Sequence, residues 1–223
     1  MNDPTTNVQI QVSDDQTVSG IVQAPADAKA CYVFAHGAGA GMAHSFMAEV
    51  AAGLASRGIA TLRYQFPYME QGKKRTDTPA VAHAAVRAAV RFAADLPGAQ
   101  RLFAGGKSFG ARMTSQAQAL EPLPGVRGLV FVGFPLHNAD QPAITRAEHL
   151  ANVKVPMLFV QGTQDKLAYW THLVPVVEKL GPIATLMKIE HADHSFHVLK
   201  RTGRTDAEVM QEVLDGMAHW MLD

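Results

Sequence analysis

The most informative segment of the chain reads Arg101-Leu102-Phe103-Ala104-Gly105-Gly106-Lys107-Ser108-Phe109-Gly110-Ala111-Arg112-Met113. An apolar run leads into the pattern Gly-x-Ser-x-Gly, and few helix breakers follow until Pro122. This order predicts a strand, a very sharp turn and a helix, with Ser108 on the turn. Glycines flank the serine because larger side chains would clash across so tight a turn. Such a turn lifts the serine hydroxyl above the sheet edge and points backbone N–H groups of the new helix toward a developing oxyanion.

The same segment also matches the end of a phosphate-binding P-loop, through Gly106-Lys107-Ser108. That motif needs a glycine five positions before its second glycine, which falls at residue 101. Position 101 is Arg, so the P-loop interpretation fails at the residue that shapes its loop.

Short apolar runs elsewhere predict the strands of a sheet. Continuous runs occupy residues 32–35, 102–104, 129–132 and 157–160, further candidates lie at 59–64 and 184–189, and residues 8–12 and 18–23 alternate like an antiparallel edge hairpin. Continuous runs are typical of parallel strands that helices cover on both faces, and helical patterns lie between them. The chain is therefore predicted to be α/β, a single domain over residues 1–223. Its mostly parallel sheet should have about eight strands, with helices on both faces.

Composition excludes several classes of protein. The 223 residues include 20 Lys and Arg against 20 Asp and Glu, with 48% hydrophobic and 18% charged residues. A chain this apolar buries a core, and its zero net charge gives no general attraction to nucleic acid or to an anionic membrane. The single cysteine, Cys31, excludes an internal disulfide and a cysteine-built zinc site, and its place in a strand candidate predicts a core residue. Residues 1–6 lack a leader pattern, and no apolar run approaches the roughly 20 residues that span a bilayer, so a cytoplasmic protein is expected.

A serine hydroxyl needs two partners to become a good nucleophile, a base and an acid that orients the base. When the serine sits on a strand–helix turn of this kind, the acid and then a histidine follow it in the chain. Asp165 follows the run at 157–160, at the edge where parallel sheets place functional groups. His194 lies in the middle of the last long loop, with freedom to reach back to the turn. We therefore predict Ser108, Asp165 and His194 as the catalytic residues.

Other residues compete for the two partner roles. His191 directly follows a strand candidate and His197 begins the next helical region, so both are better explained as surface residues. Asp193 suits a local turn or cap. Asp140, past the apolar run that ends near Phe134, is the alternative acid.

Small residues after the first continuous apolar run predict a second part of the site. The segment reads His36-Gly37-Ala38-Gly39-Ala40-Gly41, and such a loop lets the backbone approach a substrate closely. The N–H groups of Ala38 and Phe109 are predicted to form an oxyanion hole. A dinucleotide-binding fingerprint is disfavoured, because Met42 occupies its third glycine position and no acidic residue ends the next strand. His36 is expected to structure the loop, since it precedes the nucleophile in the chain.

Together these motifs resemble the α/β-hydrolase superfamily, over nearly the whole chain. The closer likeness is to small dienelactone-hydrolase-like predicted hydrolases, which are similar to the hydrolase-like domain of a non-specific-lethal complex subunit and of a testis-expressed protein. The segments that carry the likeness are residues 36–39, 63–68, 105–110, 158–165 and 193–196. The resemblance implies an α/β-hydrolase fold with Ser108, Asp165 and His194 as the triad. Lys107 in the turn is typical of that group, whereas dienelactone hydrolases proper have a cysteine nucleophile.

These observations predict hydrolysis of a small ester or thioester through an acyl-enzyme, with no cofactor and no metal. The expected partner is therefore a small-molecule ester, and the oligomeric state stays open. The alternative is a non-catalytic scaffold of the same fold that binds a partner protein. A peptidase is disfavoured, because peptidases of this fold commonly carry a further domain for which the chain has no length.

The substrate pocket is expected to be open or shallow. The segment between residues 134 and 155 is too short to form a separate lid domain. Tyr64, Tyr68, Leu136 and Trp170 are the predicted substrate-binding residues.

Overall fold

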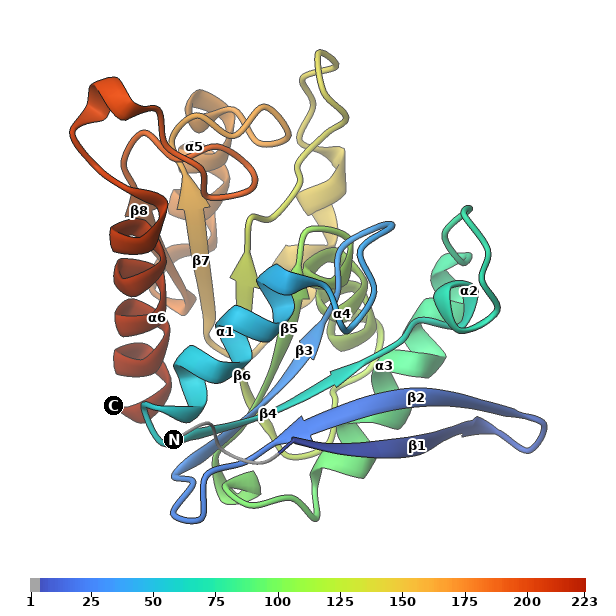
Figure 1. The fold of residues 1–223 in the computed structure, drawn as a ribbon. Helices are drawn as coiled ribbons and strands as arrows, with labels where there is room; N and C mark the ends of the chain where they lie inside the picture. Colours follow the sequence, from blue (N-terminus) through green and yellow to red (C-terminus); the bar gives the residue numbers. More distant parts are fainter. Residues whose placement is uncertain (1–4) are drawn as a thin grey trace.

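One eight-stranded sheet forms the centre of the computed structural model, which describes residues 5–223 (Figure 1). Its strands are β1 (Thr5–Ser13), β2 (Gln16–Gln23), β3 (Ala30–Ala35), β4 (Ile59–Tyr64), β5 (Leu102–Lys107), β6 (Val126–Val132), β7 (Met157–Gly162) and β8 (Ala184–Ile189). The spatial order is β1-β2-β4-β3-β5-β6-β7-β8. Strand β2 runs antiparallel to both of its neighbours, β1 and β4. The strands from β3 to β8 all run parallel to one another. The predicted mostly parallel sheet of about eight strands is confirmed. Residues 1–4 lie outside the described residues. They are part of the segment 1–6 on which the prediction about a leader pattern rests.

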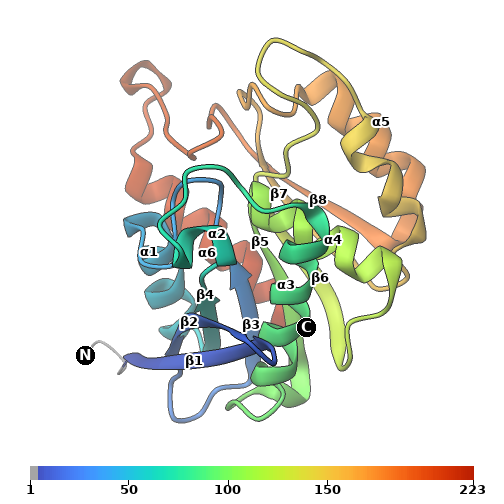
Figure 2. The ribbon, with the colours of Figure 1, turned by 90° about the vertical axis from the view of Figure 1, so that its right-hand side faces the viewer.

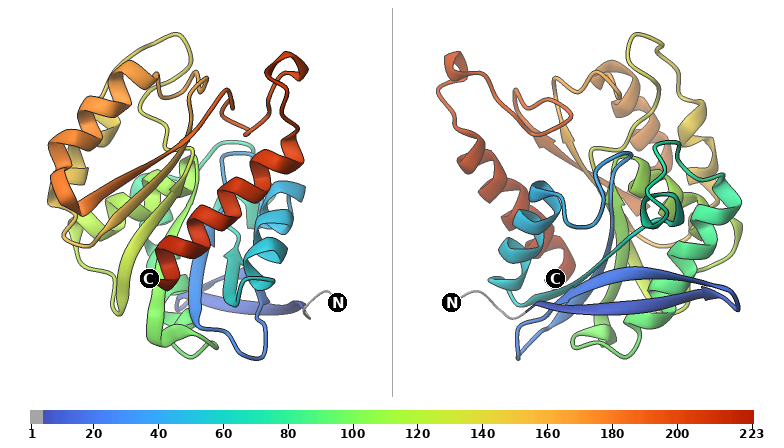
Figure 3. Two further views of the ribbon diagram at one scale, coloured as in Figure 1. Left: turned by 90° about the vertical axis from the view of Figure 1, so that its left-hand side faces the viewer. Right: turned by 45° about the vertical axis from the view of Figure 1, so that its right-hand side comes forward.

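Helices cover both faces of this sheet, as predicted. The α-helices are α1 (Ser45–Ala55), α2 (Pro67–Glu70), α3 (Pro79–Ala93), α4 (Phe109–Leu120), α5 (Trp170–Leu180) and α6 (Asp206–Leu222), and short 3-10 helices are η1 (Ala99–Arg101), η2 (Thr145–Asn152), η3 (Gly181–Ile183) and η4 (Lys200–Thr202). Helices α3, α4 and α5 pack on one face (Figure 2). Helices α1 and α6 lie side by side on the other (Figure 3).

Strand β3 shows why the buried strands have continuous apolar sequences. Successive side chains of a strand point to opposite faces of the sheet. Cys31 and Val33 therefore enter the core under α3 and α4, whereas Tyr32 and Phe34 enter the core under α1 and α6. Cys31 is fully buried, and burial raises the pKa of its thiol to about 12. The prediction that Cys31 is a core residue is confirmed.

The carboxyl ends of the parallel strands share one edge of the sheet, and the loops that follow them meet there (Figure 1). Between β6 and β7 the chain forms a loop and η2 with no separate domain, as expected. Within residues 5–223 no helix combines the length and the apolar character needed to cross a bilayer.

Candidate active site

Ser108 occupies the sharp turn between β5 and α4, with φ 52° and ψ −110°. A positive φ is strained for a residue with a side chain, and such strain concentrates at functional positions. The two glycines of the motif have a steric reason in β3. A Cβ at Gly106 would lie 2.5 Å from the Ala35 carbonyl oxygen, and one at Gly110 would lie 2.4 Å from the same atom. The turn therefore requires glycine at both positions because a neighbouring strand passes so close.

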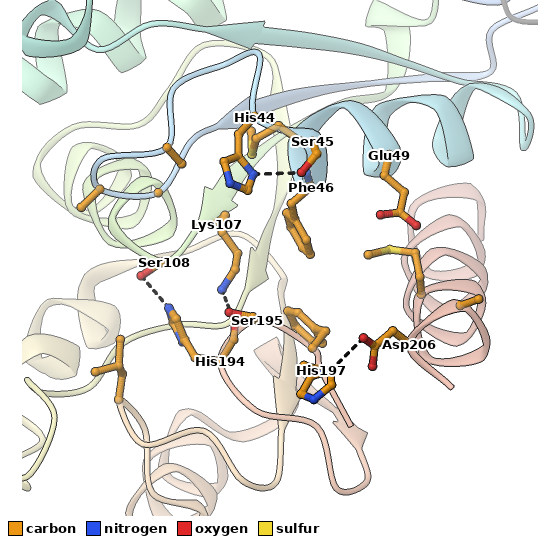
Figure 4. A pocket seen from close by; sticks show the side chains of 18 residues that line it. His44, Ser45, Phe46, Glu49, Lys107, Ser108, His194, Ser195, His197 and Asp206 are labelled. Carbon is orange, nitrogen blue, oxygen red and sulfur yellow. Dashed lines mark hydrogen bonds and ion pairs between the residues drawn. The ribbon is translucent and has the colours of Figure 1, made fainter. Parts of the chain in front are cut away.

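An unbroken chain of hydrogen bonds links Ser108 to two other side chains. The Ser108 hydroxyl Oγ and His194 Nε2 are 2.9 Å apart, and His194 Nδ1 and Asp165 Oδ2 are 2.7 Å apart. A carboxylate can only accept, so Nδ1 carries the imidazole proton and Nε2 is free to accept from the serine hydroxyl. Figure 4 shows the first of these contacts at one end of a pocket. The three residues predicted from the sequence thus come together from three separate loops.

The Asp165 carboxylate is held by more than the histidine. Its Oδ2 accepts a second hydrogen bond, from Gln161 Nε2 at 2.6 Å, and its Oδ1 accepts from the Leu167 N–H at 2.7 Å. Gln161 in turn accepts from the Phe134 N–H at 2.8 Å. The sequence does contain a signal for Gln161, a polar residue that directly extends the apolar run at 157–160. Because Asp165 is 2% exposed, these donors replace the water that a carboxylate needs.

The competing residues lie elsewhere. Asp140 is exposed on the loop after β6, and His191 is exposed at the end of β8. His197 Nδ1 is 2.8 Å from Asp206 Oδ2 at the start of α6. Asp193 accepts the N–H groups of residues 195 and 197, which is the expected role of a turn carboxylate. None of these side chains takes part in the hydrogen-bonded chain to Ser108.

The loop after β3 brings Ala38 to the same pocket as Ser108. The Gly39 N–H donates to the Tyr68 hydroxyl oxygen at 3.0 Å, and the Ala40 N–H donates to the Gly37 carbonyl at 3.3 Å. These two N–H groups of the loop therefore have partners of their own. The N–H of Phe109 belongs to the first turn of α4, where N–H groups lack a carbonyl partner within the helix.

His36 structures this loop, as expected. Its Nε2 accepts from the Phe66 N–H at 3.1 Å, which places the proton on Nδ1, and Nδ1 donates to the Gly37 carbonyl at 2.7 Å. Burial lowers the pKa of His36 to about 4, so the ring is neutral near pH 7. A neutral ring is what these two bonds require, because a protonated Nε2 could not accept.

The prediction of the substrate-binding residues is wrong. Tyr64, Tyr68 and Leu136 are fully buried, and Trp170 begins α5; none of the four lines the pocket beside Ser108. Tyr64 packs edge-to-face on Phe66 in the core under α3 and α4. The Arg-Tyr-Gln-Phe-Pro-Tyr segment at 63–68 instead braces the loop after β3, through the contacts above and through the Met42 N–H, which donates to Gln65 Oε1 at 2.9 Å.

Tyr68→Phe tests this brace, since it removes one hydroxyl and leaves the ring. A neutral hydrogen bond contributes roughly 0.5–1.5 kcal/mol, so we expect kcat/KM for p-nitrophenyl acetate to fall by about 3- to 10-fold. Tyr169→Phe is the matched control, because the Tyr169 ring packs on His137, away from this loop. An unchanged kcat/KM for Tyr68→Phe would show that the hydroxyl does not position the loop.

The pocket itself is a cleft of about 690 Å³. Its walls come from the loop after β3, the start of α1, the turn at Ser108, the loop after β8 and the start of α6, and its apolar surface includes Phe46, Met47, Leu167, Phe196 and Met210. This volume lies within the usual range for small-molecule sites. No lid domain covers the cleft, and the expectation of an open or shallow site stays a prediction. Among residues 5–223, no three His, Cys, Asp or Glu side chains are grouped to hold a metal ion.

Comparison with known proteins places this fold in a family. Residues 28–222 match the family model described as an alpha/beta hydrolase domain. Among solved structures, a dienelactone hydrolase from Anabaena variabilis is similar, with a TM-score of 0.80, 21% identity and coverage of 100% of this chain and 98% of that chain. An α/β serine hydrolase without a lid from Xanthomonas campestris gives a TM-score of 0.73, 18% identity and coverage of 97% and 94%.

A third structure, Est1E from Butyrivibrio proteoclasticus with ferulic acid bound, gives a TM-score of 0.71, 18% identity and coverage of 95% and 99%. At such identities the structural likeness shows the fold alone. The expected likeness to the non-specific-lethal complex subunit stays a prediction. Since the family model covers most of the chain, this protein belongs to the α/β-hydrolase family.

Proposed function

We propose that this chain is a serine hydrolase that cleaves a small ester or thioester through an acyl-enzyme. Ser108 is the nucleophile, His194 the general base and acid, and Asp165 the group that orients His194. The observation that carries the proposal is the continuous hydrogen-bonded chain from Ser108 Oγ through His194 to Asp165. A triad is recognised by geometry and roles of this kind rather than by sequence position.

In the first half-reaction, Ser108 Oγ bonds to the substrate carbonyl carbon while its proton passes to His194 Nε2. The carbonyl oxygen becomes an oxyanion, which the N–H groups of Ala38 and Phe109 stabilise. The intermediate then collapses and breaks the bond to the leaving group. The leaving alkoxide or thiolate takes the proton from His194 Nε2, and the acyl group stays on Ser108.

In the second half-reaction, a water molecule attacks the acyl carbon and gives its proton to His194 Nε2. The bond between the acyl carbon and Ser108 Oγ breaks, and the proton returns to the serine oxygen. Asp165 stays ionised and stabilises the imidazolium that forms in both halves. The acid product leaves and the resting hydrogen bonds are restored.

The cleft supports a small substrate with an apolar portion. Phe46 and Phe196 stack at a ring-centroid distance of 6.0 Å, and Met47 and Met210 are buried beside them. A volume of about 690 Å³ accommodates a small-molecule ester. A panel of p-nitrophenyl esters and acyl thioesters tests the proposal directly. Turnover of none of them, with no acyl-enzyme formed, would favour the scaffold alternative.

His194→Ala is expected to lower ester hydrolysis by at least about 10³-fold, because no other base replaces Nε2 at Ser108. His191→Asn is the matched control in the same loop. His191 is exposed with φ 64°, a conformation that asparagine tolerates, so this variant should keep hydrolysis within about twofold of wild type. Full activity in His194→Ala would assign the base to another residue.

A further inference from the structure

The residue before the proposed nucleophile sends its side chain across the cleft to the proposed base. Lys107 Nζ donates a hydrogen bond to the backbone carbonyl oxygen of His194 at 2.5 Å. The same ammonium lies 5.8 Å from the ring centroid of Phe46 and 5.5 Å from that of Phe196, within the range of a cation–π interaction. Figure 4 shows Lys107 between the Ser108–His194 contact and the Phe46 ring.

Gly133, just past β6, shows how closely the ammonium approaches the imidazole. A Cβ at Gly133 would lie 2.8 Å from Lys107 Nζ and 3.4 Å from His194 Cε1. The two groups therefore occupy neighbouring space above this glycine. A charge on Lys107 therefore acts on the imidazole over a short path.

The surroundings of Lys107 contain carboxylates, but none pairs with it. Of the ion pairs within 4.0 Å among residues 5–223, none involves Lys107. Burial lowers the pKa of Lys107 to about 8, against the charges of Asp165 and Asp193, which raise it. Other titratable groups line the cleft farther along, from α1, the loop after β8 and α6: His44, Glu49, His197 and Asp206. The lysine is thus mainly protonated at pH 7.

Keeping an ammonium in this partly buried place is costly, because the surrounding side chains displace part of its water. A methionine has a similar length and would fill the same space without that cost. The hydrogen bond from Nζ ends on the backbone of the proposed base, and the lysine backbone is joined directly to Ser108. Lys107 therefore links the turn to the histidine loop independently of the contact between the Ser108 hydroxyl and His194.

We propose that Lys107 is a positioning residue: it ties the His194 backbone to the turn that carries Ser108, and its charge opposes protonation of the resting imidazole. This inference rests on the proposed function, since it assumes that His194 is the base. It predicts two separable effects of removing the ammonium. The geometry of the Ser108–His194 contact should loosen, and the imidazole should become easier to protonate.

The rate of labelling by a fluorophosphonate probe, measured from pH 5 to 9, tests both effects without knowledge of the natural substrate. In this reaction the Ser108 Oγ–P bond forms, the P–F bond breaks, fluoride leaves and His194 takes the serine proton. For Lys107→Met we expect a plateau rate about 10- to 100-fold lower, because small displacements of a base are costly. We also expect the pH of half-maximal rate to rise by about 1 unit, because a neighbouring positive charge has been removed.

Two further variants separate positioning from packing. Lys107→Arg keeps a charge and N–H donors, so it should retain the wild-type pH midpoint and recover part of the rate. Lys166→Met removes an exposed lysine next to Asp165 and should leave rate and midpoint unchanged, because water screens an exposed charge. The melting temperature of Lys107→Met should stay within about 5 °C of wild type, since the lost hydrogen bond and the removed burial cost offset each other.

The outcomes distinguish this inference from the proposed function. Wild-type protein that takes up no label would overturn both. Labelled wild type with an unchanged rate and midpoint in Lys107→Met would overturn the inference and leave the proposed function standing. A slower rate with an unchanged midpoint and no recovery in Lys107→Arg would also overturn it, because lost packing alone produces that result.

Discussion

Ser108→Ala is expected to lower ester hydrolysis by about 10⁵- to 10⁶-fold, to the level that binding and the backbone N–H groups alone provide. The substitution removes the atom that bonds to the acyl carbon. It also leaves His194 Nε2 without the hydroxyl 2.9 Å away. The turn itself should persist, because alanine fits wherever the serine Cβ fits. The measurement is kcat/KM for p-nitrophenyl acetate, with circular dichroism to show that the fold is kept.

The fold offers an informative control in a second serine–histidine contact. Ser115 Oγ is 2.8 Å from His149 Nε2, which is as short as the contact at Ser108. Ser115 is fully buried on α4, and its hydroxyl also bonds to the Arg112 carbonyl at 2.9 Å. A hydroxyl that no substrate can reach does not act as a nucleophile. Ser115→Ala should therefore keep hydrolysis within a few-fold of wild type, and loss of activity only in Ser115→Ala would contradict the assignment.

Asp165→Asn is expected to cause the second largest loss, about 10⁴-fold in kcat. The carboxylate accepts three hydrogen bonds, from Gln161 Nε2, the Leu167 N–H and His194 Nδ1. An asparagine amide must turn its NH₂ group toward at least one of these donors. The imidazole then shifts its proton to Nε2, where it can no longer accept the proton of Ser108.

Asp140→Asn is the matched control for this loss. Asp140 is exposed, and its φ of 59° is one that asparagine adopts readily, so the variant should keep kcat within about twofold of wild type. Steady-state kinetics of the two variants side by side decides between the two candidate acids. Normal turnover in Asp165→Asn together with a large loss in Asp140→Asn would reassign the acid.

The sheet and the elements around Ser108 could be predicted because their signals are local. The Gly-x-Ser-x-Gly pattern, the apolar runs and the order of the acid and histidine each occupy a few consecutive residues. The strand before the turn and the helix after it need no long-range information. The same holds for the loop carrying Asp165, which directly follows a buried strand.

The cleft could not be predicted, because it joins segments that are far apart in the chain. The starts of α1 and α6 form one wall of it, although about 160 residues separate them. Phe46 and Met210 have the pattern of ordinary core positions, so nothing in the sequence marks them as lining a site. The aromatic side chains of the 63–68 segment show the reverse case. The sequence predicts that they line the site, but they face the core.

Tyr68 is a buried residue that acts on the site through its contact with a loop. It is 1% exposed and therefore cannot contact a substrate, yet its hydroxyl accepts from the Gly39 N–H in the loop that carries Ala38. The sequence predicts that Tyr68 contacts a substrate, whereas its hydroxyl contacts the loop after β3. The direction of a side chain from a short loop depends on tertiary packing, which motif spacing does not contain.

Trapping the acyl-enzyme and locating the acyl group tests directly whether Ser108 is the nucleophile. Wild-type protein is mixed with p-nitrophenyl acetate, quenched in acid within seconds, digested and mapped by mass spectrometry. We expect one acetyl group on Ser108, absent from Ser108→Ala treated in the same way. An acetyl group on another residue, or p-nitrophenol release with no covalent adduct at any residue, would contradict it.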